Sequence, residues 1–278
     1  MKLWPEGKNF HPKKSLGQNF LVDENIARKI VRLVNPQPGE TFVEIGPGSG
    51  ILTRHLLPKV KHLIAVEIDS RLVSFLKETF AENKNFSLIA GDFLRLNLRE
   101  LLRGVKHARI LGNIPYNITS PVIFKVLEHR DLFIDMTLMI QKEVAVRVVA
   151  SPGNKDYGIL SVYCQLFAEP RILFHVSRHV FKPEPEVDSS VVRWKFYQEP
   201  KFRIENQQIF DLVVHRAFQM RRKMLKSSLR KIKPVAQYLK KIDFDLNRRP
   251  EELSPEQWVQ LSNLISKVIP GGKIIQNG

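Results

Sequence analysis

The segment TFVEIGPGSGILTRHLL, residues 41–57, joins a strand pattern, a glycine-rich turn and a helix pattern without interruption. Gly46, Gly48 and Gly50 fall in the turn between the two patterns. Glycine in such a turn permits positive φ angles and lets the backbone approach a ligand closely. The segment therefore predicts a ligand-binding turn that leads from one strand of a parallel sheet into a helix.

Short apolar runs alternate with helix-like segments from about Glu40 to Phe196, which is typical of a parallel sheet covered by helices. Apolar residues near a 3.6 period predict helices over residues 51–57, 70–80 and 121–127. We predict a Rossmann-like α/β fold with a seven-stranded sheet that ends in an antiparallel hairpin, formed by the last two runs. The strand-like runs are TFVEIG, HLIAVEI, FSLIAGD, ARILGNI, DMTLMIQ, GILSVYCQLF, RILFHVS and SSVVRWKF.

The sequence loses its strand character after Glu199 and Pro200 and becomes helical. We therefore predict a catalytic domain over residues 1–200, with a basic N-terminal segment over residues 1–20. A small, all-helical domain is predicted over residues 201–278. Its first helix has an apolar face, formed by Phe210, Val213, Val214, Ala217 and Phe218.

The charge balance indicates a polyanionic partner, since 44 basic and 28 acidic residues give a net charge of +16. Residues 201–278 hold 16 basic and 7 acidic residues, whereas residues 1–200 hold 28 and 21. The helical domain is thus the more basic per residue. A merely solvated basic surface is the alternative interpretation.

The chain contains no apolar stretch of signal-peptide or membrane-spanning length, so we expect a cytoplasmic protein with no membrane partner. Cys164 is the single cysteine, and it lies in the run SVYCQLF, which is expected to be a buried strand. Neither a disulfide framework nor a cysteine-rich metal site is available, and we predict no metal.

Acidic residues follow two further strand patterns. Glu67 comes 21 residues after Gly46, where a carboxylate can accept both hydroxyls of a ribose. Asp92 ends the third strand and can accept a hydrogen bond from an adenine amine. A dinucleotide-binding dehydrogenase shares the glycine turn and the acid that ends the second strand. The glycine spacing GxGxG, in place of GxGxxG, favours S-adenosylmethionine as the cofactor. Ile68 and Phe93, the neighbours of the two acids, are expected to line the same pocket.

The tetrapeptide Asn113-Ile114-Pro115-Tyr116 resembles the (Asn/Asp)-x-Pro-(Tyr/Phe) motif of amino methyltransferases. The Asn113 side chain and the Ile114 carbonyl are expected to accept the two hydrogens of an adenine amine, and Pro115 to hold that carbonyl in place. Tyr116 is expected to stack on the base. Phe181, on a proline-rich loop, is a candidate for the other face of the base or a core residue.

The sequence from about residue 12 to 270 resembles the small-subunit ribosomal RNA adenine N6,N6-dimethyltransferases. The matching segments are KKSLGQNFL (13–21), EIGPGSG (44–50), VEID (66–69), GDFL (91–94), GNIPYNITSP (112–121), QKEVAVRVVA (141–150), YGILSV (157–162), VFKPEPEVDS (180–189) and FQMRRKMLKSSL (218–229).

This resemblance implies that Asn19 and Leu21 help to close the cofactor pocket. It also implies two methyl transfers to each of two adjacent adenosines in the hairpin near the 3′ end of the small-subunit RNA. We expect a monomer that acts on this RNA or on the 30S particle or its precursor, with a role in ribosome biogenesis. The residues expected to contact RNA are Lys13, Lys14, Arg221, Arg222, Lys223 and Lys226.

Two other functions compete with this interpretation. A methyltransferase that acts on one adenine of large-subunit RNA and confers macrolide resistance shares QNF and NIPY. A non-catalytic RNA-binding assembly or transcription factor could keep the same fold. The segments EIGPGSG and VFKPEPEVDS favour the small-subunit group over the first, and intact Asn113, Pro115 and Tyr116 argue against the second.

Overall fold

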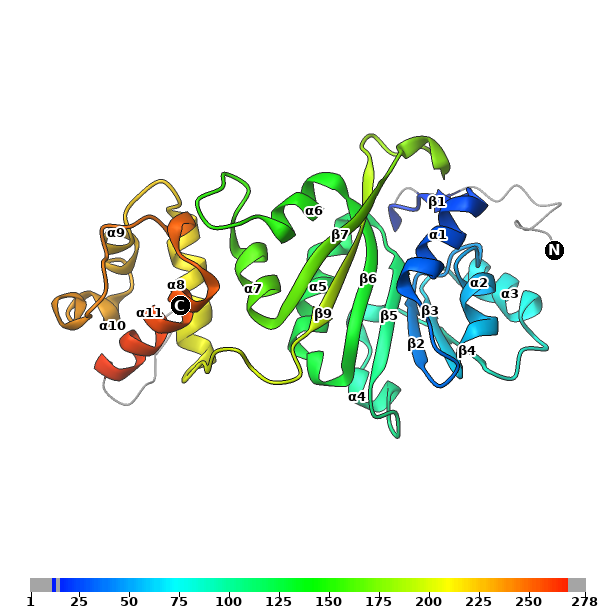
Figure 1. Ribbon diagram of the computed structural model, residues 1–278, viewed down its shortest axis with the longest axis horizontal. Coiled ribbons are helices and arrows are strands. Elements are labelled where there is room, and N and C mark those ends of the chain that lie inside the picture. The colour runs from blue at the N-terminus through cyan, green and yellow to red at the C-terminus, as the bar shows by residue number, and fades with distance from the viewer. Residues whose placement is uncertain (1–11, 14–15, 270–278) are drawn as a thin grey trace. The chain divides into compact units, whose positions relative to one another are not determined.

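The computed structural model describes residues 12–13 and 16–269. The chain divides into two units (Figure 1). The first holds the described residues up to Ala145 together with Glu169–Gln198, and the second holds Val146–Ala168 and the described residues from Glu199 onward. The second unit thus includes a segment that the sequence patterns place in the first.

A seven-stranded sheet of order β4-β3-β2-β5-β6-β9-β7 forms the centre of the first unit. The parallel pairs are β2 with β3 and β5, β3 with β4, and β5 with β6, whereas β9 runs antiparallel to β6. The predicted seven-stranded α/β architecture is therefore confirmed, and the last two strands are neighbours as expected. The strands are β2 (Thr41–Ile45), β3 (His62–Glu67), β4 (Phe86–Ala90), β5 (Ala108–Asn113), β6 (Phe133–Gln141), β7 (Ala168–Val176) and β9 (Ser189–Phe196).

The strand order reverses between β2 and β5, because the chain moves outward from β2 to β3 and β4 and then returns to add β5 on the other side. Ligands of open α/β sheets bind at such a reversal, outside the carboxyl ends of the strands. The glycine turn after β2 and the tetrapeptide at the end of β5 lie at this position.

Helices cover the sheet, and α1, α2 and α3 gather beside strands β2, β3 and β4 (Figure 1). Asp23 caps α1 by accepting a hydrogen bond from the backbone N–H of Ile26 at 2.9 Å. The helices of this unit are α1 (Glu24–Val34), α2 (Thr53–Leu56), α3 (Ser70–Thr79), α4 (Leu98–Leu101), α5 (Thr119–Glu128) and α6 (Lys142–Val149), the last of which continues into the second unit.

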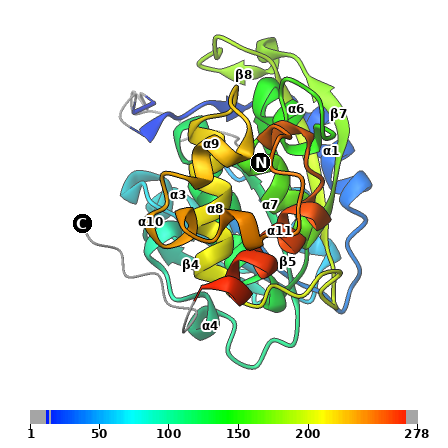
Figure 2. The same ribbon diagram turned by 90° about the vertical axis from the view of Figure 1, so that its left-hand side faces the viewer.

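The second unit is helical, as predicted (Figure 2). Phe210, Val213, Val214 and Ala217 form the buried face of its first long helix after residue 200, as their spacing predicted, while Phe218 is half-buried. The helices are α7 (Ile159–Phe167), α8 (Gln207–Gln219), α9 (Leu225–Leu229), α10 (Lys233–Ala236) and α11 (Pro255–Val268).

The run GILSVYCQLF is helix α7, so its assignment as a strand was wrong. The Ser161 hydroxyl accepts a hydrogen bond from the Gly158 N–H at 3.0 Å and closes the first turn of the helix. A continuous apolar run does not distinguish a buried strand from a buried helix, because both bury side chains on every side. Cys164 is therefore a buried helical residue.

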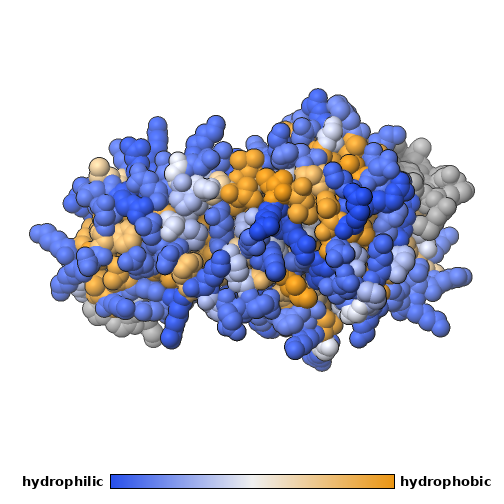
Figure 3. Space-filling view, viewed as in Figure 1, coloured by the Kyte–Doolittle hydropathy of each residue, from blue (hydrophilic) through white to orange (hydrophobic). Residues whose placement is uncertain are grey.

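Hydrophilic residues cover most of the face seen in Figure 3, in keeping with the high content of charged residues. Within residues 12–13 and 16–269, no helix is long and apolar enough to cross a membrane. The same residues contain no group of three or more His, Cys, Asp or Glu side chains that could hold a metal ion.

Candidate active site

The glycine turn after β2 takes a conformation that larger residues rarely adopt. Gly46 and Gly48 have φ angles of 65° and 58°. A Cβ atom at Gly48 would lie 3.0 Å from the ring of Phe20, so this ring would have to shift by a few tenths of an ångström. The backbone angle is therefore the main reason for glycine at this position.

Glu67 ends β3 beside this turn, and its carboxylate is held in place by backbone donors. It accepts hydrogen bonds from the N–H of Gly48 at 3.1 Å and of Asp69 at 2.9 Å. Burial raises the pKa of Glu67, although these two hydrogen bonds oppose the shift. A carboxylate has about four acceptor positions, so Glu67 can still accept bonds from a ligand.

Glu44 is a second buried acid at this site, and the sequence patterns did not indicate it. It accepts a hydrogen bond from the Thr53 hydroxyl at 2.7 Å and is 1% exposed. Burial and, to a smaller extent, the charge of Glu67 raise the pKa of Glu44 to about 8. At neutral pH Glu44 is therefore mostly protonated. The sequence signal that could have identified Glu44 is its position at the end of the strand pattern, two residues before Gly46.

Asp92 follows β4 and caps a short 3-10 helix, Phe93–Arg95, by accepting from the Leu94 N–H at 2.9 Å. A ligand-binding role is compatible with this capping role, since a carboxylate has two oxygens. Phe93 is buried at 4% exposure, whereas Ile68, which follows β3, is 52% exposed. All three residues line the same pocket as the glycine turn.

The N-terminal segment crosses the same pocket. Strand β1 (Phe20–Leu21) pairs antiparallel with β8 (Phe181–Lys182). The Gln18 side chain donates to the Asp69 carboxylate at 3.0 Å. Asn19 and Leu21 consequently lie in the pocket lining, where the resemblance had placed them.

Asn113 is the last residue of β5, and its side-chain nitrogen donates to the Asn19 carbonyl oxygen at 3.1 Å. This bond uses one of the two N–H donors of the amide and fixes which end of the amide faces Asn19, so the side-chain oxygen remains an acceptor. Pro115 has φ −55° and ψ 139°, an extended conformation that turns the chain into the 3-10 helix Tyr116–Ile118. Asn113, Ile114, Pro115 and Tyr116 all line the pocket.

Tyr116 is half-buried, and its hydroxyl shares a hydrogen bond with the hydroxyl of Ser189 at 2.7 Å. Ser189 is fully buried at the start of β9, opposite Gln141 in β6. Burial raises the pKa of Tyr116, so its hydroxyl stays protonated at neutral pH. Ser189 belongs to the segment VFKPEPEVDS, but only the tertiary contact indicates its role.

Phe181 is buried in the hydrophobic core of the first unit. It is 3% exposed and belongs to a hydrophobic cluster with Leu21, Val176 and Val191. It is absent from the pocket lining found among the described residues. These contacts match its interpretation as a core residue, and its contact with the base stays a prediction.

The residues expected to contact RNA have varied surroundings. Lys13 lies 3.7 Å from Asp69, and Lys14 lies outside the described residues. Arg221 pairs with Glu251 at 2.7 Å and so has a structural partner within the second unit. Lys226 donates to Asn247 at 2.8 Å. Arg222 and Lys223 are exposed.

The structure thus brings every residue predicted to bind the cofactor into one pocket at the reversal of the strand order. These residues are Asn19, Leu21, Gly46, Gly48, Glu67, Ile68, Asp92, Phe93 and Asn113. Together with the tetrapeptide that closes β5, this arrangement places the protein in the class of Rossmann-like methyltransferases. Two solved structures of that class resemble it over most of their length.

One is the dimethyladenosine transferase from Plasmodium falciparum, with a TM-score of 0.74, 28% identity, and coverage of 87% of this chain and 95% of that chain. The other is the 23S rRNA methyltransferase ErmE, with a TM-score of 0.67, 26% identity, and coverage of 88% and 99%. The geometry of the chain therefore resembles both a dimethyladenosine transferase and an enzyme of 23S rRNA.

The sequence defines the family. Residues 9–267 match the model of the ribosomal RNA adenine dimethylases, and the chain belongs to this family. The ribosomal RNA small subunit methyltransferase A of Chlorobium phaeobacteroides is 43% identical over 251 residues, which cover 90% of this chain and 89% of that protein. The protein of the same name from Geobacter metallireducens is 38% identical over 275 residues, which cover 96% and 99%.

Proposed function

We propose that this protein transfers methyl groups from S-adenosylmethionine to the N6 amine of adenosines in small-subunit ribosomal RNA. The observation that carries the proposal is the orientation of Asn113, whose donor end is bonded to Asn19 while its oxygen remains an acceptor beside the pocket. An amine substrate has N–H groups to donate, so it requires a hydrogen-bond acceptor such as the Asn113 side-chain oxygen.

The residues of the pocket fit S-adenosylmethionine. Gly46 and Gly48 form the turn in the pocket wall, and Glu67 would offer carboxylate oxygens to the ribose hydroxyls. Asp92 would accept a hydrogen bond from the adenine amine of the cofactor, and Ile68 and Phe93 would contact the adenine ring. When bound, the cofactor supplies an electrophilic methyl group on sulfur.

The chain's own residues make the substrate nitrogen reactive. The lone pair of an adenine amine is delocalised into the ring, which makes the nitrogen a poor nucleophile. The Asn113 oxygen and the Ile114 carbonyl accept its two hydrogens and favour a pyramidal nitrogen. Alignment of the nitrogen with the methyl group supplies much of the remaining rate, up to about 7–11 kcal/mol in well-oriented systems.

Tyr116 holds the base that is to be methylated. An enzyme that acts on a base in structured RNA must extrude it, which costs least in unpaired loops. Stacking on an aromatic ring contributes about 1–3 kcal/mol per base. The proposed targets are two adjacent adenosines of the hairpin near the 3′ end of the RNA, each methylated twice. This part of the proposal rests on the resemblance of the motifs.

The small subunit is favoured over the large one by sequence. The two relatives named as small-subunit enzymes are 43% and 38% identical, whereas the large-subunit enzyme ErmE is 26% identical. We extend the proposal to a monomer that acts in the cytoplasm on the 30S particle or its precursor and contributes to ribosome biogenesis.

The test incubates the protein with labelled S-adenosylmethionine and unmodified small or large ribosomal subunits, and then maps the modified bases. We expect dimethylated adenosines in the small subunit only. The matched variant Asn113→Ala is expected to lose methyl transfer by at least about a hundredfold, because it removes an acceptor for the amine, and to keep its RNA affinity. Modification of the large subunit, or an active Asn113→Ala variant, would refute the proposal.

A further inference from the structure

A basic hollow lies on α1 and α2, on the outer surface of the first unit. Five basic side chains line it: Arg28, Lys29 and Arg32 from α1, and His55 and Lys59 from α2 and the turn that follows. Its lining, as far as the described residues form it, contains no aspartate or glutamate. We call this surface the α1 hollow.

The cations of the α1 hollow share one part of the helix surface, and contacts with neighbouring side chains orient two of them. Arg28 and Arg32 are four residues apart, so they share one face of the helix, about 6 Å apart along its axis. The Arg28 guanidinium donates to the Asn25 side chain at 2.7 Å. The Lys29 ammonium lies 4.0 Å from the centre of the Phe174 ring. Two of the three cations of α1 are thus held in fixed directions.

Contacts within the fold orient Arg28 and Lys29 but do not neutralise their charges, because Asn25 and Phe174 are uncharged. A cation in the last turn of a helix is favourable, and this explains Arg32 alone. Two like charges four residues apart destabilise a helix. The nearby carboxylate of Glu24 is already bound by Arg54 and by His55, the latter at 2.7 Å. An external anion is therefore the partner that suits the hollow.

The proposed substrate supplies such an anion. Helix α1 begins three residues after Leu21, which lines the active-site pocket, and its 11 residues lead about 16 Å away from the pocket. The far end of the helix lies near the start of β5, because the carbonyl oxygen of Asn35 accepts a hydrogen bond from Arg109. A ribosomal RNA is long enough to cover this surface as well as the pocket, and its backbone carries a charge at every phosphate. We propose that the α1 hollow binds the phosphate backbone of the substrate RNA, at a second RNA-binding surface outside the basic helical unit. This inference rests on the proposed function for its choice of RNA.

The experiment compares two double variants that each lose two positive charges. Arg28→Ala/Arg32→Ala removes the cations of one helix face, and alanine there favours the helix. Lys77→Ala/Lys84→Ala, the control, removes two exposed lysines of the same unit, away from the hollow. Affinity for a transcript of small-subunit ribosomal RNA is measured from low to moderate salt, and thermal unfolding verifies that both variants are folded.

We expect the slope of log K against log salt to fall by about two for Arg28→Ala/Arg32→Ala, one for each phosphate that is no longer neutralised, and to change little for the control. An unchanged slope for the first variant, or an equal fall for both, would overturn the proposal. Methyl transfer by the unaltered protein is measured separately. A failure of the proposed function is therefore distinguished from a failure of this inference, which concerns binding alone.

Discussion

At the scale of single residues, the active site depends on hydrogen bonds that fix the direction of side chains. The bond from Asn113 to Asn19 orients an amide, and the bond between Tyr116 and Ser189 orients an aromatic ring. Neither Asn19 nor Ser189 needs to touch the reacting atoms. In the proposed mechanism each acts through Asn113 or Tyr116, which would make it a positioning residue.

We predict that Ser189→Ala lowers kcat by about fivefold, because the Tyr116 ring loses a bond worth about 1 kcal/mol and with it a fixed orientation. The KM for RNA should change little, since the rest of the RNA-binding surface is intact. Steady-state kinetics of methyl transfer provide the measurement.

Tyr116→Phe is the matched control for this prediction, because it keeps the ring and removes the same bond from the other side. The double variant should be no worse than either single variant. Additive losses would show that the two hydroxyls act independently.

A second prediction at this scale concerns Glu44, whose pKa of about 8 in the folded protein exceeds its ordinary value of 4.5. Between these two values the unfolded chain releases the proton while the folded chain keeps it. The free energy of unfolding therefore falls as the pH rises through this window, by up to about 5 kcal/mol. Below it both states hold the proton, and the effect vanishes.

Glu44→Gln cannot ionise, so it should remove this part of the pH dependence. Urea denaturation from about pH 5 to about pH 8 should show the variant gaining stability relative to the unaltered protein as the pH rises. Glu78→Gln, which replaces an exposed acid of the same unit, serves as a comparison. Parallel stability curves for Glu44→Gln and the unaltered protein would contradict the assignment.

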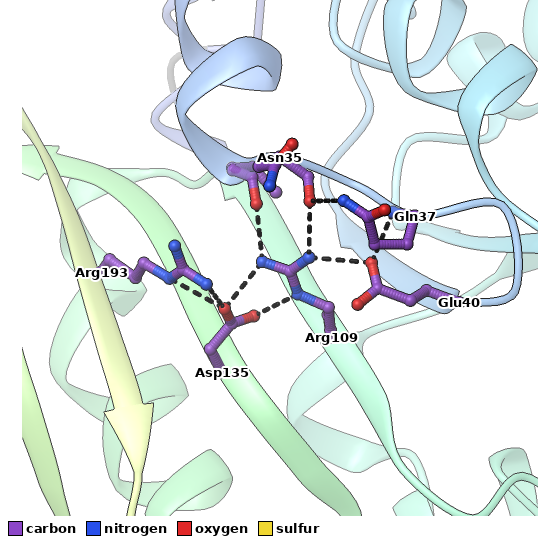
Figure 4. Close-up of polar contacts among 7 residues, drawn as sticks. Asn35, Gln37, Glu40, Arg109, Asp135 and Arg193 are labelled. Carbon is purple, nitrogen blue, oxygen red and sulfur yellow. Dashed lines mark hydrogen bonds and ion pairs between the residues drawn. The ribbon is translucent and has the colours of Figure 1, made fainter.

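At the scale of elements, one buried ion network joins three strands (Figure 4). The Arg109 guanidinium in β5 donates to the Asp135 carboxylate in β6 through two nitrogens, each at 2.7 Å. Its other N–H groups reach Glu40 at 2.8 Å and the carbonyl oxygens of Val34 and Asn35. Arg193 in β9 also donates to Asp135, at 2.8 Å. Every donor of the buried guanidinium therefore has an acceptor.

We predict that Asp135→Ala lowers the free energy of unfolding by about 3–5 kcal/mol, since it leaves the Arg109 charge buried with its main partner removed. Chemical denaturation provides the measurement. Arg193→Ala should cost about 1 kcal/mol, because its side chain is 32% exposed and the Arg109–Asp135 pair survives its loss. Equal losses for the two variants would show that the buried charge is not the cause.

At the scale of the whole molecule, positive charge is carried by both units. The second unit presents Arg222 and Lys223 to solvent, while Arg221 beside them is bound to Glu251. The prediction that all three residues contact RNA stays untested. Arg221 has a structural contact with Glu251 in addition.

We predict that Arg222→Ala/Lys223→Ala flattens the salt dependence of RNA binding by about one unit for each phosphate that the variant fails to bind. Filter binding of small-subunit RNA over a range of salt measures it. Arg203→Ala/Lys240→Ala removes the same charge from exposed positions of the same unit and should have a smaller effect. If the two slopes agree, net charge alone governs binding by this unit.

Much of the fold and of the pocket could be predicted from the sequence, because local patterns carry them. Strand periodicity, the glycine turn and the acids that end β3 and follow β4 are each defined by a few consecutive residues. Parallel strands place their carboxyl ends at one edge, so these short segments meet without further information. The NIPY tetrapeptide was recognisable for the same reason.

Helix assignment, burial and side-chain orientation depend on contacts between distant segments, and only the tertiary structure decided them. Only the structure shows that the apolar run of α7 is a helix and that Phe181 lies in the core, and burial raised the pKa of Glu44. The orientation of Asn113 depends on a residue 94 positions away, and that of Tyr116 on one 73 positions away. Hydrogen bonding and desolvation depend on what surrounds a group in space, and the order of residues along the chain does not contain that information locally.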